Sequence, residues 1–522
     1  MIREISRRKC LRLWLCKPEY MERTKWENRF VLLRFRKKNY MMFLKDLKRF
    51  KMERLYDKLK AYSESDFYAF HMPGHKRNKA LLGIELPYDL DITEIDGFDD
   101  LHHADGILKE EQERAARVFG AEESHFLVNG STAGILSAVM GCTHRGDKIL
   151  VARHCHKSIY HAIYMNGLVP RYVYPEFDIS MHMNGEISKE DVAKALAAEP
   201  DIKAVVIVSP NYDGVVSDVK GIAEVAHSYR IPLIVDEAHG PHFGFHPVFP
   251  GRANDLGADV VINSLHKTLP SLTQTAILHI NGKIVNRRRI KKYLDMLQSS
   301  SPSYIFMASL DACVDFVDGK CENAFELYVE RLQKFREELE PLQHLQILRT
   351  EHYDISKVVI STANANITSP ELAERLRKEY HLEMEMTGGT YVLAMTTVAD
   401  TQEGLDRLKA ALLEIDGQLE AKTAVSGSIE ISGELPRLEQ YFTPQEAADR
   451  EEDGEAEEIP WKESEGHISL EYAYLYPPGS PVIVPGERIS QEAVELLRYY
   501  ETQNLQIEGI QTEGKIKVWK HE

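Results

Sequence analysis

The stretch VVINSLHKT, residues 260–268, joins a short apolar run to a lysine flanked by polar residues. The apolar run is typical of a strand that is buried on both faces of a sheet. Lys267, just past that strand, can form a Schiff base with an aldehyde cofactor if desolvation keeps its amine neutral part of the time. An ordinary surface lysine is the alternative interpretation, and this stretch alone does not distinguish the two.

A second apolar stretch, IPLIVDEAHG at residues 231–240, places Asp236 directly after its run of aliphatic residues. Pyridoxal phosphate needs a lysine for its aldehyde and a carboxylate that keeps its pyridine nitrogen protonated. An aspartate that caps a helix is the alternative interpretation. The pair Lys267 and Asp236 therefore suggests this cofactor.

Short apolar runs separated by helical segments recur through the first half of the chain. Because such runs are typical of a mainly parallel sheet, we predict an α/β fold. The predicted strands are 126–128, 148–151, 169–174, 204–208, 231–235 and 260–262. Ligands of open sheets bind beyond the carboxyl ends of the strands. Four polar residues fall there: Ser131, His156, Asp236 and Lys267.

The stretch NGSTAG at residues 129–134 follows one predicted strand and opens a helix rich in small residues. It places the backbone N–H groups of Gly130, Ser131 and Thr132, with two hydroxyls, at a helix N-terminus, where the helix dipole favours a phosphate. Serine and threonine also cap many helices that bind no ligand. The stretch is neither a Walker loop nor a GxGxxG fingerprint, so it disfavours nucleotide binding.

Composition excludes several classes of function. The net charge of -17 argues against nucleic acid as the main partner, because phosphate binding needs a basic face. The six cysteines form no CxxC pair and no zinc-site spacing, so we expect a reduced, cytoplasmic compartment. His102 and His103 are adjacent and lack the i, i+4 spacing of a helical metal pair, so we expect no metal.

The first 50 residues differ from the rest, with 16 Lys and Arg against 5 Asp and Glu. Their longest apolar run is far shorter than the roughly 20 residues of a membrane span, and no signal peptide is recognisable, so we expect no membrane partner. A basic arm, a targeting segment and a start codon set too early are the three interpretations. We favour the last, because Met52 opens an ordinary amphipathic helix.

The chain is long enough for several domains. Residues 443–465 are rich in Glu and Asp and poor in apolar residues, which favours a connector. The predicted division is a basic extension at 1–51, a cofactor-binding domain at 52–295, a smaller α+β domain at 296–420, an acidic connector at 421–465 and a C-terminal α+β domain at 466–522.

From about residue 52 to 515, the chain resembles the Orn/Lys/Arg decarboxylase family of fold-type-I pyridoxal-phosphate enzymes, in the short form without an N-terminal wing domain. The matching pieces are HMPGHK at 71–76, DITEIDGFDDLHH at 91–103, NGSTAG at 129–134, HKS at 156–158, DEAHG at 236–240, SLHKT at 264–268, SPSY at 301–304 and YPPGSPVIVPGE at 476–487.

The resemblance implies a role for each site residue. Lys267 would bind the cofactor aldehyde, Asp236 would pair with the pyridine nitrogen, and His156 would stack on the ring. The residues implied to hold the phosphate or flank the lysine are Ser131, Thr132, Ser264 and His266. Ser300 would reach the phosphate of a neighbouring subunit, although the family usually shows threonine there. His239 would be a supporting partner or a packed core histidine.

The implied activity is decarboxylation of arginine, lysine or ornithine, with arginine preferred because short forms of the family often take it. The product would feed polyamine synthesis, and the enzyme would be a homodimer or a higher homo-oligomer. Lys267 or His266 would return a proton to the α carbon, and Glu487 and Glu94 would meet the distal cation of the substrate. The alternatives are an aminotransferase or C–S lyase of the same fold and a non-catalytic relative.

Overall fold

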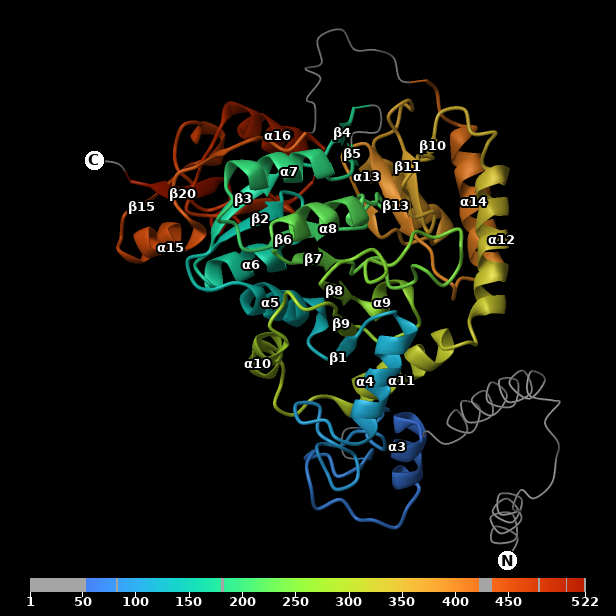
Figure 1. Cartoon of the computed structure of the whole chain (residues 1–522). Coiled ribbons are helices and arrows are strands. Elements are labelled where there is room, and N and C mark those ends of the chain that lie inside the picture. Colours follow the sequence, from blue (N-terminus) through green and yellow to red (C-terminus); the bar gives the residue numbers. More distant parts are fainter. Residues whose placement is uncertain are drawn as a thin grey trace, which may run out of the picture. The chain divides into compact units, whose positions relative to one another are not determined.

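The computed structural model describes residues 53–80, 83–179, 183–421, 434–476, 479–503 and 505–520. The chain divides into two units after Glu53, and the second unit runs from Arg54 to Glu522. The predicted basic extension, with its interpretation as a misplaced start, lies outside the described residues. The elements described below all belong to the second unit (Figure 1).

A seven-stranded sheet forms the centre of the larger domain. Its strands are β1 (Glu123–Leu127), β2 (Lys148–Ala152), β3 (Val169–Val173), β6 (Val205–Val208), β7 (Leu233–Asp236), β8 (Val260–Asn263) and β9 (Ala276–Ile280). The strand order is β1-β9-β8-β7-β6-β2-β3. β9 alone runs opposite to the other six strands, so the predicted mainly parallel sheet is confirmed. β9 itself was not among the predicted strands.

Helices cover both faces of this sheet (Figure 1). They include α5 (Gly130–Cys142), α6 (Lys157–Met165), α7 (Lys189–Ala198), α8 (Val219–Ser228) and α10 (Arg287–Leu297). α5 packs against α6 and α10, and α7 packs against α8. The aliphatic residues of β2, β6, β7 and β8 are buried in the core between the helices, which explains why these strands read as continuous apolar runs.

Several further elements complete the first part of the chain. α3 (Leu55–Ser63) and α4 (Ile107–Val118) both pack against α11 (Tyr304–Val317). A short hairpin is formed by β4 (Phe177–Asp178) and β5 (Met183–Asn184). α9 (Leu265–Thr268) is a single helical turn that follows β8. This turn carries the lysine on which the sequence interpretation rests.

The smaller domain is an α+β unit, as predicted. Its antiparallel sheet has the order β10-β11-β13-β12. The strands are β10 (Gln346–Ile347), β11 (Lys357–Ser361), β12 (Met386–Thr387) and β13 (Tyr391–Met395), and the helices are α12 (Glu322–Glu338), α13 (Ser369–Tyr380) and α14 (Gln402–Asp416). Lys357, the first residue of β11, contacts His239 of the larger domain.

The C-terminal region starts earlier than predicted. The expected connector contains β14 (Glu439–Gln440), α15 (Pro444–Glu452), β15 (Ala456–Pro460) and a 3-10 turn at Trp461–Glu463. Later elements are β16 (Ala473–Leu475), β17 (Pro481–Ile483), β18 (Glu487–Arg488), α16 (Gln491–Thr502), β19 (Ile507–Glu508) and β20 (Lys515–Trp519).

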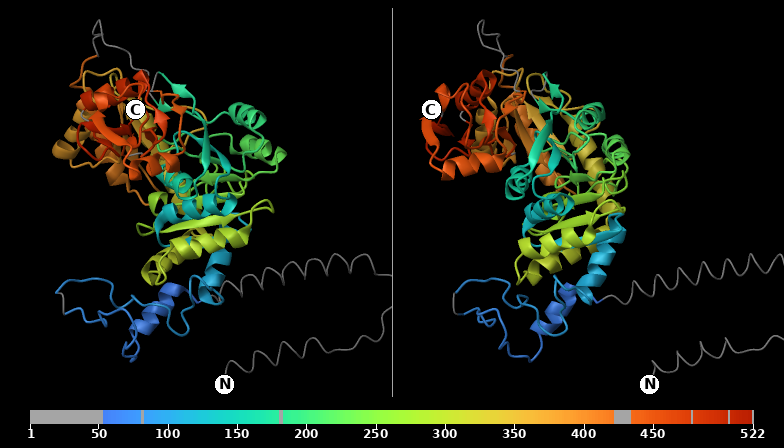
Figure 2. Two further views of the ribbon diagram at one scale, coloured as in Figure 1. Left: turned by 90° about the vertical axis from the view of Figure 1, so that its left-hand side faces the viewer. Right: turned by 60° about the vertical axis from the view of Figure 1, so that its left-hand side comes forward.

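Residues 434–465 therefore belong to the fold of the C-terminal region and do not act as a connector. β14 pairs with β18, and β15 pairs with β20. Trp461 lies in one core with Ile516 and Val518. The elements of this C-terminal region gather together at the red end of the chain (Figure 2). The acidic residues of 443–465 are exposed or partly exposed, so the composition of the stretch concealed its few buried anchors. Across the described residues, no helix is long and apolar enough to cross a membrane.

Candidate active site

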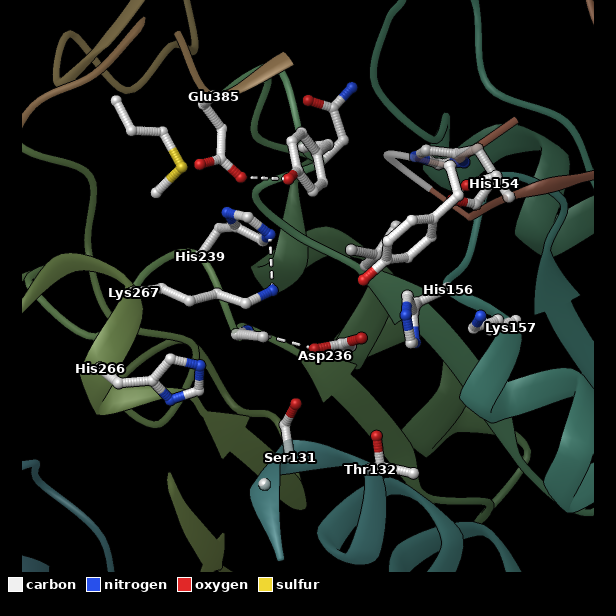
Figure 3. A pocket seen from close by; sticks show the side chains of 18 of the residues that line it. Ser131, Thr132, His154, His156, Lys157, Asp236, His239, His266, Lys267 and Glu385 are labelled. Carbon is white, nitrogen blue, oxygen red and sulfur yellow. Dashed lines mark hydrogen bonds between the residues drawn. The ribbon is translucent and has the colours of Figure 1, made fainter. Parts of the chain in front are cut away.

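A cavity of about 630 Å³ lies where the central strands end, and its wall includes the ends of β6 and β7 and the turn α9 (Figure 3). Seven predicted cofactor residues line it together with Gly130: Ser131, Thr132, His156, Asp236, His239, His266 and Lys267. These residues come from four separate segments of the chain. The sheet topology brings them together, because parallel strands place their carboxyl ends on one edge.

Lys267 projects from α9 into this cavity (Figure 3). Its Nζ atom lies 2.8 Å from Nε2 of His239. Burial lowers the pKa of the Lys267 amine, and the negative charge of Asp236 opposes that shift. A lowered pKa gives the amine a larger neutral fraction, and only the neutral amine attacks an aldehyde.

Asp236 is the last residue of β7, and only 3% of its surface is exposed. Its Oδ1 atom accepts a hydrogen bond of 3.1 Å from the backbone N–H of Ala238. Burial raises the pKa of this carboxyl group, whereas the positive charge of Lys267 lowers it. A buried carboxylate is costly without a cationic partner, and a protonated pyridine nitrogen would be such a partner.

The N-terminus of α5 forms the floor of the cavity. Gly130 adopts φ +71°, a conformation that favours glycine, and this lets the chain turn from β1 into the helix. The preceding residue, Asn129, makes no capping hydrogen bond with its side chain. The hydroxyl groups of Ser131 and Thr132 point up into the cavity (Figure 3). Together these groups fit a phosphate.

His156 and His266 flank the cavity on different sides (Figure 3). His156 caps α6, with its Nδ1 accepting from the backbone N–H of Ser158, and burial lowers its pKa to about 4. Its neutral ring suits stacking on a heterocycle. His266 donates from Nδ1 to the carbonyl of Thr275 at 2.8 Å, which leaves Nε2 with a free lone pair. Burial also lowers the pKa of His266.

His239 is more than a packed core histidine. It lines the cavity and contacts Lys267 through Nε2. Its other ring nitrogen, Nδ1, lies 2.8 Å from Nζ of Lys357, the first residue of β11. A residue of the smaller domain is thereby linked to Lys267.

The donor set fits pyridoxal phosphate in chemistry. An amine of lowered pKa, a buried carboxylate, a neutral imidazole ring and a helix N-terminus with two hydroxyls share one cavity. These are the partners that an aldehyde, a pyridine nitrogen, an aromatic face and a phosphate each require.

Besides Glu487, three predicted residues do not line this cavity within the single chain. Ser264 is fully buried, and its hydroxyl has no hydrogen-bond partner among the described residues. Ser300 is exposed in the loop after α10, and its predicted contact is with a second subunit. Glu94 is partly buried in the loop that precedes α4. Their predicted contacts remain predictions.

Glu487 occupies a different place from the one predicted. Its side chain is fully buried, 2.9 Å from Nη2 of Arg153, and it accepts from the backbone N–H of Val484 at 2.8 Å. It does not line the cavity. Because Arg153 follows β2 and Glu487 lies in β18, this ion pair joins the C-terminal region to the central sheet. Glu487 therefore has a structural role in this chain and is no longer a candidate for the substrate cation.

Replacing Glu487 with alanine is expected to destabilise the protein by about 3–5 kcal/mol, because Arg153 would be left buried without a counter-charge. The measurement is the shift of the urea unfolding midpoint. Glu439→Ala is the matched control, since its pair with Arg488 is exposed and is worth about 1 kcal/mol or less. A Glu487→Ala protein of unchanged midpoint but weaker substrate binding would contradict this assignment.

Sequence analysis missed several residues of the cavity wall. They include His154, Asn211, Tyr212, Asp213, Gln274, Glu385 and Tyr476. Tyr212 and Asp213 follow β6, so the rule of strand ends already pointed to them. Glu385 comes from the smaller domain and accepts a hydrogen bond from the hydroxyl of Tyr212; nothing in its local sequence signals this.

Among the described residues, no group of three His, Cys, Asp or Glu side chains is arranged to hold a metal.

Together, the sheet, the strand-end cavity and its lysine define an enzyme scaffold of fold type I. Two family models extend over most of the chain: the Orn/Lys/Arg decarboxylase major domain matches residues 53–422, and the C-terminal domain of the same family matches residues 433–514. The chain therefore belongs to the Orn/Lys/Arg decarboxylase family, as the motifs predicted, and it is an amino-acid decarboxylase.

Individual relatives agree with this assignment. The chain is 34% identical to an arginine decarboxylase of Bacillus subtilis, over 85% of this chain and 92% of the relative. It is 25% identical to a lysine decarboxylase of Pseudomonas aeruginosa, over 83% and 73%. The solved structure of the constitutive lysine decarboxylase of Escherichia coli matches with a TM-score of 0.77 at 20% identity, over 96% of this chain and 86% of that one, which supports the fold.

Proposed function

We propose that this protein uses pyridoxal phosphate to remove the α-carboxyl group of arginine. The observation that carries the proposal is the cavity in which Lys267, Asp236 and the N-terminus of α5 meet. The family implies the cofactor, and the cavity offers a partner for each of its reactive groups. The product, agmatine, is a polyamine precursor.

Each residue has a distinct task in this proposal. The phosphate would be held by Ser131, Thr132 and the backbone at the start of α5. Asp236 would keep the proton on the ring nitrogen. Lys267 would bind the aldehyde carbon. When bound, pyridoxal phosphate supplies an electron-poor ring that accepts the electron pair left behind as CO2 departs. Two groups in the cavity can hold the proton that returns to the α carbon: Nζ of Lys267 and Nε2 of His266.

The acids in the cavity favour a substrate with a distal cation. Glu385 and Asp213 both line the wall, on the side of the smaller domain and after β6. A planar guanidinium group pairs with carboxylates through two parallel hydrogen bonds, which an ammonium group does not do. We propose Glu385 and Asp213 as the substrate acids in place of Glu487.

The relatives favour arginine over lysine. Four curated relatives named arginine decarboxylase are 32–34% identical to this chain. Those named lysine decarboxylase are 23–25% identical. Higher identity to one group supports a shared substrate.

An equimolar mixture of arginine, lysine and ornithine tests this choice. We expect agmatine to form about tenfold or more faster than the amines from lysine and ornithine, because a site built for a guanidinium leaves its acids poorly paired with a shorter ammonium. Amines and released CO2 are measured together. Dominant formation of the other two amines would overturn the substrate, and keto acid without CO2 would indicate an aminotransferase.

We also propose that a second copy of the chain is part of the active enzyme. Large apolar side chains are exposed near the loop at residues 71–76: Phe67, Tyr68, Phe70 and Met72. Exposed clusters of this kind mark contact surfaces. Ser300 is the residue predicted to reach the phosphate of a neighbouring subunit. Next to it, the carbonyl of Ser299 lies 2.8 Å from Nε2 of His102. A solution mass equal to a single chain, measured by sedimentation, would contradict this proposal.

A further inference from the structure

Lys357 is a fully buried lysine that the proposed chemistry does not use. It begins β11 and has no exposed surface. Its side-chain stem packs on Gly214, where an added Cβ would lie only 2.8 Å from Cγ of Lys357. Its Nζ atom lies 5.6 Å from the ring centre of Tyr212 and 2.8 Å from Nδ1 of His239. The amine is therefore aimed at one imidazole nitrogen.

His239 stands between two lysine amines, with Nδ1 facing Lys357 and Nε2 facing Lys267, each at 2.8 Å. Burial lowers the pKa of His239 well below its usual value, so the ring is neutral. A neutral imidazole donates from one nitrogen and accepts at the other. A protonated lysine amine only donates. Both hydrogen bonds can therefore exist together only when at least one lysine is neutral, because the lysine that faces the imidazole N–H must accept there.

We propose that Lys357 and Lys267 share a single proton through His239, so that Lys357 acts as a positioning residue that lets Lys267 exist as a neutral amine. In one arrangement, Lys357 donates to Nδ1 and Nε2–H donates to neutral Lys267. In the other, Lys267 donates to Nε2 and Nδ1–H donates to neutral Lys357. Moving one proton along each hydrogen bond interconverts them without changing the total charge.

The charges around the three groups are consistent with one shared proton. Burial lowers the pKa of both lysines, that of Lys357 to about 8, so the pair readily gives up one of its two protons. The carboxylates that favour the remaining proton lie on both sides: Asp354, Asp213 and Glu385 act on Lys357, and Asp236 and Glu385 act on Lys267. His156 and His266 face His239 from the larger domain.

Lys357 can serve as this second position for the proton because it is fixed from several sides. Its backbone carbonyl accepts from the hydroxyl of Tyr353 and from Nη2 of Arg336, both at 2.8 Å. Nothing in this network places Lys357 in the cavity itself. Its hydrogen-bond connection to the Lys267 amine runs through His239, which distinguishes it from the groups that would touch the cofactor.

The test is the pH dependence with which the Lys267 amine reacts in full-length protein, and it needs no turnover. Two aldehyde probes are used, formaldehyde and pyridoxal phosphate, each trapped by reduction and quantified on the Lys267 peptide by mass spectrometry. The Lys357→Met variant has no amine that can take up the shared proton, so the proton stays on Lys267. We expect the reactive midpoint to rise by about one pH unit and the rate near neutral pH to fall about tenfold.

Lys357→Arg should act in the opposite direction. A permanently protonated guanidinium donates to Nδ1 and keeps Nε2–H directed at a neutral Lys267, so the midpoint should fall or stay at the wild-type value. Lys378→Met is the matched control, because this lysine belongs to the same domain and is exposed. Its midpoint should equal that of the wild type.

An unchanged midpoint in Lys357→Met would overturn the inference, and so would an upward shift in both variants, since lost packing would affect them alike. If Lys357→Arg does not fold, the Lys357→Met midpoint still decides. The inference rests on the proposed function, but the probes separate the two. Wild-type protein that captures formaldehyde but never pyridoxal phosphate would refute the proposed function alone. Capture of both aldehydes, with no shift of the reactive midpoint in Lys357→Met, would refute the shared proton alone.

Discussion

Lys267→Ala is expected to lose decarboxylation by roughly 10³-fold or more, because it removes both the group that would bind the cofactor aldehyde and one of the two proton carriers in the cavity. The variant should also fail to retain pyridoxal phosphate through desalting. The measurements are CO2 release and the visible absorbance of bound cofactor. Because Lys267 is on a single helical turn at the cavity wall, thermal stability should change little.

Lys220→Ala is the control for this experiment, since Lys220 is exposed on α8. Its activity and cofactor content should match the wild type. A Lys267→Ala protein that keeps its cofactor and more than a tenth of the wild-type rate would show that another amine does the chemistry. A loss of rate together with a large loss of stability would instead point to misfolding.

Asp236→Asn is expected to lower the rate by about 10²–10³-fold, the cost typical of removing one preorganised electrostatic group. The substitution is close to isosteric, and the amide oxygen can still accept from Ala238 N–H, so the end of β7 should remain intact. Only the negative charge is lost. The ring nitrogen of the cofactor would then lose its proton, and the ring would accept electrons poorly.

The measurements for Asp236→Asn are the rate at saturating cofactor and the pH at which Lys267 reacts. The carboxylate raises the pKa of Lys267 in the wild type, so the reactive midpoint should move to lower pH in the variant. Asp191→Asn, which changes an exposed acid in α7, is the control. An unchanged rate in Asp236→Asn would mean that this acid only caps the turn after β7.

Much of the site could be predicted because strand ends are a local signal. Asp236 and Lys267 each follow an aliphatic run, and a parallel sheet places such positions on one edge whatever the sequence between them. Ser131 follows the same rule from the start of α5. The structure places all three on one cavity wall.

The missed residues depend on contacts that no local pattern encodes. Lys357 meets His239 across 118 positions of sequence, and Glu487 meets Arg153 across 334. The local sequence around Glu487, a glutamate after a Pro-Gly turn, does not indicate whether its side chain faces a substrate or a buried arginine. The prediction that residues 443–465 form a connector was wrong for a related reason. A few buried side chains such as Trp461 fix this stretch in the fold although most of its residues are exposed and charged.

We propose Lys267 as the residue that carries pyridoxal phosphate. The most direct test of this proposal is to mix the full-length protein with the cofactor, reduce with borohydride and map the modified peptide by mass spectrometry. We expect the pyridoxyl mass on Lys267, and none on the nearby Lys157 or Lys357. Modification of either of those lysines in its place, or of no lysine at all, would contradict it.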